Sequence, residues 1–223
     1  MKFKNKALRI ACDGGAASGK SLAAKLVGQK YGLYVLNSGI FYRYASFLVI
    51  KNNPKNIISF LKKKFKNLNS KNVFKLNLHS QEISEHVVNL AKQKKIRNII
   101  RAYQKKLIKK YPRIVVEGRD TASSIMLKNP RYTVAFYFSC SLDVASYRRW
   151  KDLKKKIPLR EIKKSLKNRT LQDKKRRQNP LIKVANAVEI RTHLLTKSQM
   201  VQKMSKEIDR TLLLKYGRNF KRK

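Results

Sequence analysis

The N-terminal part of the chain contains a glycine-rich segment whose residue types suit phosphate binding. Residues 14–21 read Gly-Gly-Ala-Ala-Ser-Gly-Lys-Ser and fit the pattern G-x-x-x-x-G-K-[ST] without a mismatch. Glycines let backbone N–H groups turn toward phosphate oxygens, and a helix that begins just after the loop adds its positive end. Lys20 can neutralise charge on the β- and γ-phosphates, and the Ser21 hydroxyl can reach Mg²⁺. The pattern predicts an ATP site, with Ser21 as the metal-binding residue, made of Gly14, Gly15, Ala16, Ala17, Ser18, Gly19, Lys20 and Ser21.

The segments on either side distinguish a phosphate loop from a chance glycine turn. An apolar run at residues 7–12 predicts a short strand before the loop. Residues 21–31 predict a helix after it, with Leu22, Leu26 and Val27 on the inward side. A strand, a glycine loop and an amphipathic helix in this order favour phosphate binding.

The rest of the chain alternates between strand-like and helix-like segments. Short apolar runs predict further strands at residues 33–36, 113–117, 132–138 and 188–190. Helical spacing predicts helices at residues 38–50, 94–110, 142–153 and 197–214. Such alternation favours a parallel sheet covered on both faces. Two stretches differ: residues 52–93 have the broken, Lys- and Asn-rich pattern of an inserted subdomain, and residues 159–177 read as a very basic helix and loop.

The charge balance is strongly basic, with 55 Lys and Arg against 12 Asp and Glu and a net charge of +43. Such a field attracts polyanions, including nucleotides, nucleic acids and anionic membranes. The lysines are spread along the whole chain rather than confined to one arm, so individual arginines indicate phosphate sites more specifically than the total charge does. We expect any nucleic-acid binding to be non-specific.

The remaining composition predicts a cytoplasmic protein with no membrane partner. No apolar stretch reaches the roughly 18 residues that a transmembrane helix needs, and the first residues lack the pattern of a signal peptide. Cys12 and Cys140 lie in or beside apolar runs, so buried, reduced thiols are expected rather than a disulfide. The three histidines, His79, His86 and His193, show no metal-ligand spacing with the cysteines.

Five motifs, in the same order, resemble those of the bacterial cytidylate kinases, a family of P-loop nucleoside monophosphate kinases. Residues 12–20 resemble the family's opening I-D-G-P-x-x-x-G-K, and residues 36–43 (LNSGIFYR) resemble L-D-[ST]-G-x-x-Y-R. Residues 116–120 (VEGRD) resemble x-[DE]-G-R-D, and residues 148–149 match the paired arginines after the fourth strand. Residues 169–181 match R-x3-D-x2-R-x3-P-L at every interval. The resemblance covers nearly the whole chain.

The resemblance implies an α/β fold of the three-layer P-loop NTPase type, with a central parallel sheet, an acceptor-binding insertion and a basic lid. Residues 1–51 and 94–223 would form the kinase core, with the lid at about 157–178. Residues 52–93 would form the inserted subdomain on the acceptor side. The implied reaction transfers the γ-phosphoryl group of Mg·ATP to CMP or dCMP, and we expect a monomeric enzyme.

The same resemblance assigns roles to individual residues. Lys20, Arg119, Arg169 and Arg176 would be catalytic. The substrate-binding set would be Ser38, Tyr42, Arg43, Arg97, Arg119, Asp120, Arg169, Asp173 and Arg176. Asp120 would accept a hydrogen bond from the exocyclic amine of cytosine, which uracil lacks, and Asp173 would bind the ribose. The lid arginines suit phosphates because their planar fork binds two oxygens at once.

Simpler interpretations stay open for several of these residues. Ser38 could be only a helix N-cap, Tyr42 a core residue, Asp120 a loop cap and Arg97 a solvated charge. The paired arginines, Arg148 and Arg149, would serve the ATP side of the lid hinge or charge a helix end.

The chain also departs from the family pattern. Val88 stands where the family has a base-contacting serine, and Asn37 and Asn186 replace aspartates. The hydroxyl of Ser21 comes one place earlier than the threonine of the family's G-K-G-T, which is the general phosphate-loop pattern. Residues 121–124 replace a glycine-bearing turn.

Two other functions fit parts of the pattern. The same loop could serve a kinase for another small acceptor, against which Asp120 and the lid residues argue. The charge could belong to an RNA-binding protein with a vestigial nucleotide site, but the chain lacks RNP-type aromatic signatures.

Overall fold

The computed structural model describes Phe3 and residues 5–217 of the chain. These residues form two compact units. The first unit comprises the chain up to Leu36 and again from Tyr111 onward, and the second comprises Asn37–Lys110. The chain therefore leaves the first unit after its second strand and returns to it before its third.

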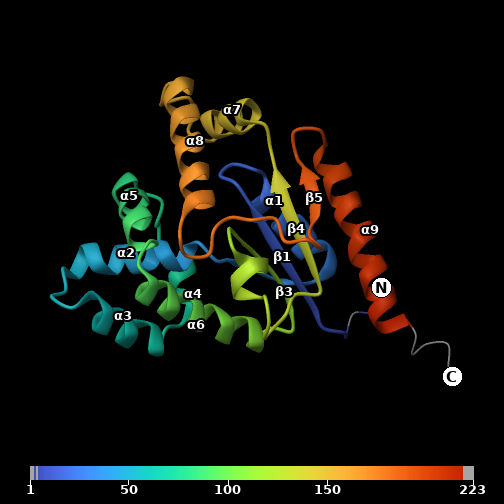
Figure 1. Cartoon of the computed structure of the whole chain (residues 1–223), viewed down its shortest axis with the longest axis horizontal. Coiled ribbons are helices and arrows are strands. Elements are labelled where there is room, and N and C mark those ends of the chain that lie inside the picture. Colours follow the sequence, from blue (N-terminus) through green and yellow to red (C-terminus); the bar gives the residue numbers. More distant parts are fainter. Residues whose placement is uncertain (1–2, 4, 218–223) are drawn as a thin grey trace. The chain divides into compact units, whose positions relative to one another are not determined.

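The first unit is built on a five-stranded sheet with the strand order β2-β3-β1-β4-β5 (Figure 1). The strands are Leu8–Gly14 (β1), Tyr34–Asn37 (β2), Arg113–Gly118 (β3), Val134–Ser139 (β4) and Val188–Arg191 (β5). Strand β1 pairs in parallel with β3 and with β4, and β4 pairs in parallel with β5. This confirms the predicted α/β fold with a central parallel sheet. The chain crosses to opposite sides of β1 on its way to β2 and β4, and parallel sheets bind ligands at the carboxyl ends beside such a reversal.

Two helices cover one face of this sheet. Helix α1 (Lys20–Tyr31) packs on β3, and helix α9 (Lys197–Tyr216) packs on β4 and on α1. Val27, Phe136, Met204 and Ile208 are among the side chains fully buried in this layer. Burying one large apolar side chain contributes about 1.5–3 kcal/mol, so this layer holds the strand ends firmly in place.

The expected inward face of α1 was wrong in one position. Leu22 is 39% exposed, whereas Ala23, Ala24 and Val27 are fully buried. Small alanine side chains let the helix approach the strands closely, which rotates the buried stripe by one residue from the predicted one. The other predicted strands and helices agree with the structure to within two residues at each end.

Three further elements of the first unit lie next to the strand ends. A short π-helical turn, Thr121–Ile125 (η1), follows β3. Helices α7 (Leu142–Asp152) and α8 (Leu159–Lys175) pack on each other through Ala145, Ile162 and their neighbours. The predicted basic helix and loop is thus α8 with the segment after it, and most of its lysines are exposed.

The second unit is helical. Its helices are Ile40–Asn52 (α2), Ile57–Lys66 (α3), Ser70–Phe74 (α4), Gln81–Leu90 (α5) and Lys94–Lys110 (α6). Tyr103 of α6 lies edge-on to Phe41 of α2 and to Phe65 of α3, with ring centroids 5.2 and 5.8 Å apart. The unit is therefore wider than the expected insertion at residues 52–93, because α2 and α6 supply part of its core.

The cysteine prediction holds fully at one of two positions. Cys12 is buried in β1, whereas Cys140 is partly exposed, and both thiols are free. In the part of the chain that the structure describes, no helix has the length and apolar character needed to cross a membrane.

Candidate active site

The glycine loop connects the end of β1 to the start of α1, as predicted. A Cβ atom at Gly14 would lie 2.5 Å from the carbonyl oxygen of Phe138, so only glycine fits between the neighbouring strands. Gly19 has φ +82°, a left-handed conformation that glycine adopts without strain. Ala17 is also left-handed, with φ +53°. These backbone turns shape the loop into a concave path immediately before the helix N-terminus, which is the arrangement that binds phosphate.

Lys20 is buried at the base of this loop, where its Nζ donates a hydrogen bond to the carbonyl oxygen of Gly15 at 3.0 Å. Burial lowers the pKa of Lys20 to about 7, and the positive charges of Arg119 and Arg169 act in the same direction against the opposing charge of Glu117. An anion bound in the loop would restore the charged form. The loop is therefore electrostatically prepared for a phosphate.

The loop is braced from behind by a chain of hydrogen bonds. Thr192, just after β5, donates from Oγ1 to the carbonyl oxygen of Ser18 at 3.0 Å. Arg148 of α7 donates to both Oγ1 and the carbonyl oxygen of Thr192, at 3.0 and 2.9 Å. The Ser18 hydroxyl is buried and has no hydrogen-bond partner among the described residues, so it is available to a ligand. Thr192 has no motif around it, and only the paired arginines drew attention to Arg148.

A buried carboxylate positions the segment that follows β3. The two carboxylate oxygens of Asp13 accept hydrogen bonds from the backbone N–H groups of Thr121 and Ala122, each at 2.7 Å. Burial raises the pKa of Asp13 to about 6, although these two hydrogen bonds act in the opposite direction. Asp13 therefore fixes η1, and with it Asp120, which directly precedes that turn. The sequence shows Asp13 within a motif but does not reveal this structural role.

Four charged side chains at the strand ends form a continuous chain of ion pairs. Asp120 contacts Arg176 with an O–N distance of 3.1 Å, and Arg176 contacts Asp173 at 3.4 Å. Asp173 contacts Nε of Arg119 at 3.1 Å, and Arg119 also donates to the carbonyl oxygen of Gly14. We call Asp120, Arg176, Asp173 and Arg119 the ion-pair chain. It joins the C-terminal part of α8 to the phosphate loop and unites four residues predicted from widely separated motifs.

Arg169 lies one turn earlier on α8 and is exposed. Its charge is close enough to lower the pKa of both Lys20 and Arg119. The neighbouring Thr170 also comes close to the loop, since a Cβ atom built at Gly15 would lie 3.5 Å from its hydroxyl. The structure thus places α8 directly beside the phosphate loop.

The second unit contains four residues that were predicted to bind the acceptor: Ser38, Tyr42, Arg43 and Arg97. Arg97 of α6 is buried, with its guanidinium 5.5 Å from the centre of the Tyr42 ring. Arg43 donates to the carbonyl oxygen of Leu78 and to the hydroxyl of Ser84, both at 3.0 Å, and so ties α2 to α5.

Ser38 is also buried, and its carbonyl oxygen accepts a hydrogen bond from the side chain of Gln104 at 2.8 Å. Two of the residues that depart from the family pattern also make hydrogen bonds. Asn37 accepts a hydrogen bond from the N–H of Gly39, and Asn186 accepts one from the hydroxyl of Tyr132.

Glu117 and Ser21 supply oxygen atoms near the loop. Glu117 is buried at the end of β3, in register with Cys12 on β1, and its charge acts on Lys20. Ser21 is exposed in the first turn of α1. The described residues contain no group of three or more His, Cys, Asp or Glu side chains that could hold a metal ion by themselves. Glu117 was missed as a site residue, although its place one strand over from the loop could have suggested it.

Comparison with known proteins assigns the chain to a family. A model of the cytidylate kinase family matches residues 10–210. A cytidylate kinase of Clostridium botulinum (strain Hall) is 32% identical over 212 residues, covering 88% of this chain and 95% of that protein. The cytidylate kinase of Clostridium tetani is 29% identical, covering 94% of this chain and 97% of that protein.

Two other matches are of different kinds: one is to part of a longer protein, and the other is a likeness in fold with low sequence identity. The bifunctional pantoate ligase/cytidylate kinase of Prochlorococcus marinus (strain MIT 9312) is 33% identical, covering 87% of this chain and 41% of that protein. A shikimate kinase from Bacteroides thetaiotaomicron resembles this chain in fold alone, with a TM-score of 0.50 and 12% identity over 91% of this chain and 98% of that one. On the family match and on full-length relatives above 30% identity, the chain belongs to the cytidylate kinase family.

Proposed function

We propose that this protein transfers the γ-phosphoryl group of ATP to CMP or dCMP, giving CDP or dCDP and ADP. Membership of the cytidylate kinase family supports ATP-dependent phosphorylation of these acceptors. The observation that carries the proposal is the ion-pair chain, because it places Asp120 and three lid or strand-end residues beside a complete phosphate loop. We also propose that the enzyme acts as a monomer in the cytoplasm.

The ATP half of the site would be formed by the loop and Lys20. Backbone N–H groups of the loop and the N-terminus of α1 would bind the β- and γ-phosphates. Phosphate oxygens would hold Lys20 in its charged form, and the buried Ser18 hydroxyl would gain a partner. Lys20 then neutralises charge that develops as the phosphoryl group moves.

The oxygen donors near the loop fit a magnesium ion bound together with ATP. Mg²⁺ prefers oxygen ligands and takes one or two from the protein, with the rest from phosphates and water. Ser21 and Glu117 would hold it together with the phosphates, since the described residues offer no group of three or more His, Cys, Asp or Glu side chains that could bind the ion without ATP. When bound, the ion supplies positive charge to the phosphate oxygens.

The acceptor half would use the ion-pair chain. Asp120 would accept a hydrogen bond from the cytosine amine, and Asp173 would accept one from the ribose. Arg119 and Arg176 would exchange these carboxylates for phosphate oxygens, to which their planar forks bind through two hydrogen bonds. Arg169 would add charge from the exposed side of α8.

The second unit would contribute the remaining acceptor contacts. We propose that Arg97 binds the acceptor phosphate and that Ser38 and Tyr42 lie near it. Tyr42 already lies against the guanidinium of Arg97, which holds the charge in one orientation. Arg43 has a second role in this proposal, since its hydrogen bonds to Leu78 and Ser84 set the position of α2 relative to α5.

The reaction needs no covalent enzyme intermediate. An oxygen of the CMP phosphate attacks the γ-phosphorus of ATP, the bond to the β-phosphate oxygen breaks, and ADP leaves with the electron pair. The attacking oxygen already bears negative charge, so no strong base is required. Positioning and charge neutralisation by Lys20, Arg119, Arg169 and Arg176 supply the rate, and closure of α8 excludes water.

The test is ADP release by purified protein with Mg·ATP and each of CMP, dCMP, UMP, AMP and GMP. Turnover confined to CMP and dCMP is expected. In Asp120→Asn the amide can donate to the uracil carbonyl, so kcat/KM for CMP should fall about 10- to 100-fold while UMP gains relative to it. An unchanged melting temperature is the folding control. Turnover with another acceptor would retain a kinase and reject the cytosine assignment, and no turnover at all would reject the function.

A further inference from the structure

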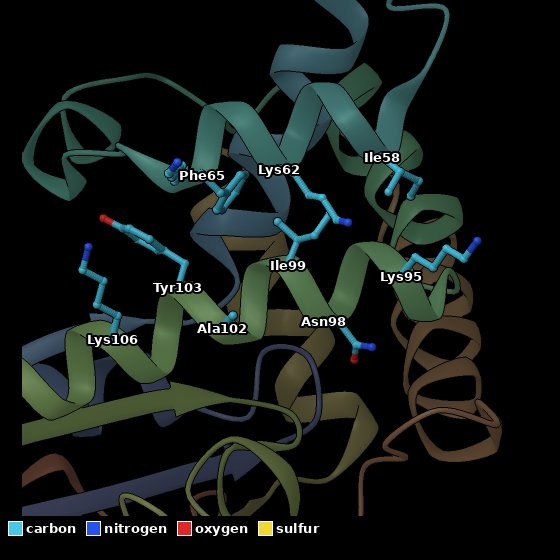
Figure 2. Close-up of a pocket in the computed structure, with 10 residues that line it drawn as sticks. Ile58, Lys62, Phe65, Lys95, Asn98, Ile99, Ala102, Tyr103 and Lys106 are labelled. Carbon is cyan, nitrogen blue, oxygen red and sulfur yellow. The ribbon is translucent and has the colours of Figure 1, made fainter.

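The second unit contains a groove between α3 and α6 that the proposed reaction does not use. Its volume is about 700 Å³, and Figure 2 shows the two helices running along its sides. The residues that line it come from one face of each helix and are Ile58, Lys62, Phe65, Lys66, Lys95, Asn98, Ile99, Ala102, Tyr103 and Lys106. On α6 these positions repeat at three and four residues over about three turns, so the groove is long enough for several turns of a third helix.

The groove has an apolar floor and a cationic border. Ile58, Ile99 and Tyr103 provide the floor, and among the residues that the structure describes the charged side chains that line the groove are all lysines, from both helices. The sequences of α3 and α6 contain no Asp or Glu. An occupant must therefore be apolar on one side and acidic along its edges, because each lysine lacks an opposite charge on its own helix.

This groove is separate from the acceptor residues on the same helix. At about 100° per residue, position 97 lies on the opposite side of α6 from positions 95, 99 and 102. The contact between Arg97 and the ring of Tyr42 agrees with this placement. Substitutions in the groove can therefore be tested without altering the proposed acceptor contacts.

We propose that this groove binds an acidic amphipathic helix of a partner protein. A helix-in-groove complex places apolar side chains at spacings of three, four and seven residues into such a floor, with charged residues at the rim. Here the floor would receive the apolar stripe, and Lys62, Lys95 and Lys106 would pair with carboxylates on both sides. The positive charge of the groove thus favours a partner with negative charge, and the shape of the groove favours a helix.

Other occupants fit less well. RNA would need exposed aromatic rings for base stacking, but Phe65 and Tyr103 are only 4% and 7% exposed. A membrane would need apolar side chains that protrude, whereas Ile58 and Ile99 lie half-buried between two helices. A second copy of this chain, with 12 acidic against 55 basic residues, cannot supply the required negative charge.

The probe is a synthetic fluorescent peptide of about 18 residues, with leucines on one helical face and glutamates beside them. Fluorescence anisotropy should show saturable binding at low salt. Binding should weaken about tenfold or more in Lys62→Glu/Lys106→Glu and in Ile99→Glu. The matched control is Lys51→Glu/Lys64→Glu, which makes the same charge change at two exposed lysines of the same unit that do not line the groove, and it should alter binding less than about threefold.

Further controls separate the possible outcomes. A peptide with lysines in place of the glutamates should not bind, and CMP phosphorylation should be unchanged in all variants. The proposal is overturned if the peptide does not saturate, or if the control double variant weakens binding as much as the groove variant. Binding of phosphatidylglycerol vesicles or of single-stranded RNA that depends on Lys62, Lys106 and Ile99, with no such dependence for the peptide, would also overturn it.

Discussion

Lys20 is the residue whose ionisation is most strongly altered by its position. A buried ammonium group beside the positive charges of Arg119 and Arg169 holds its proton weakly, which brings its pKa down to about 7. In the free protein, about half of the molecules would then carry an uncharged Lys20 near neutral pH. Phosphate oxygens reverse this effect, because they favour the charged form.

Nucleotide binding should therefore be linked to proton uptake. At a pH above about 7, the pKa of Lys20 in the nucleotide-free protein, Lys20 is mostly neutral before binding and charged after it. At about pH 8 the binding of each Mg·ATP should therefore be accompanied by the uptake of close to one proton from solution. At about pH 6 Lys20 is already charged, and uptake should nearly vanish. Calorimetry in buffers of different ionisation enthalpy measures this number directly.

The control is Lys20→Arg, since a guanidinium stays charged throughout this pH range. It should bind Mg·ATP without the uptake at about pH 8, and any proton release by the nucleotide itself will appear equally in both proteins. Equal uptake in the two proteins would show that Lys20 is not the group that titrates.

Elements far apart in the sequence meet at the phosphate loop. Thr192 follows β5 and Arg148 lies on α7, yet together they hold the carbonyl oxygen of Ser18. The loop therefore keeps its shape through side chains that never touch ATP in the proposed mechanism. Arg148 is in this sense a positioning residue.

Removing the Arg148 side chain should weaken the binding of ATP and leave the binding of the acceptor unchanged. Arg148→Met should raise the KM for ATP about tenfold, because Thr192, which donates to the carbonyl oxygen of Ser18, loses its two hydrogen bonds from Arg148. The KM for CMP should change little. Steady-state kinetics with each substrate varied in turn measures both constants.

Arg149→Met is the matched control, because Arg149 is the exposed neighbour on the same helix. It should leave both constants within about twofold of the parent values. A loss of CMP affinity in Arg148→Met, or the same rise in the KM for ATP in both variants, would contradict the positioning role.

Local patterns predicted the elements well and the contacts between distant segments poorly. The loop could be predicted because all eight of its residues are contiguous, and α6 was predicted at residues 94–110 because its apolar spacing is regular. Thr192 and Ser18 lie 174 positions apart, and no local pattern records such a pairing. The exposed Leu22 was expected inside because periodicity identifies a stripe but not its exact rotation against the strands.

On the scale of the whole molecule, the charge of +43 is not concentrated in one place. Lysines cover helices of both units, and the acidic side chains gather in small numbers at sites such as the ion-pair chain. Polyanions should therefore bind at many positions without reading sequence.

Binding to single-stranded RNA should accordingly be strongly salt-dependent and independent of sequence. Two unrelated oligonucleotides of equal length should give affinities within about threefold of each other, with the same steep slope of log affinity against log salt. Fluorescence anisotropy over a salt series measures the slopes. A preference of about tenfold or more for one sequence would indicate a dedicated RNA site and contradict the expectation of non-specific binding.

The ion-pair chain also limits what can bind at the proposed acceptor site. Arg119 and Arg176 already hold carboxylates, so a free sulfate or phosphate ion that binds either guanidinium must leave Asp120 or Asp173 without its counter-ion. In the proposed function a nucleotide avoids this penalty, because its phosphate would bind the arginines while its amine and ribose hydroxyl would bind the aspartates. The proposed acceptor site would therefore require both kinds of group in one molecule, so the small anions around this very basic protein would bind there only weakly.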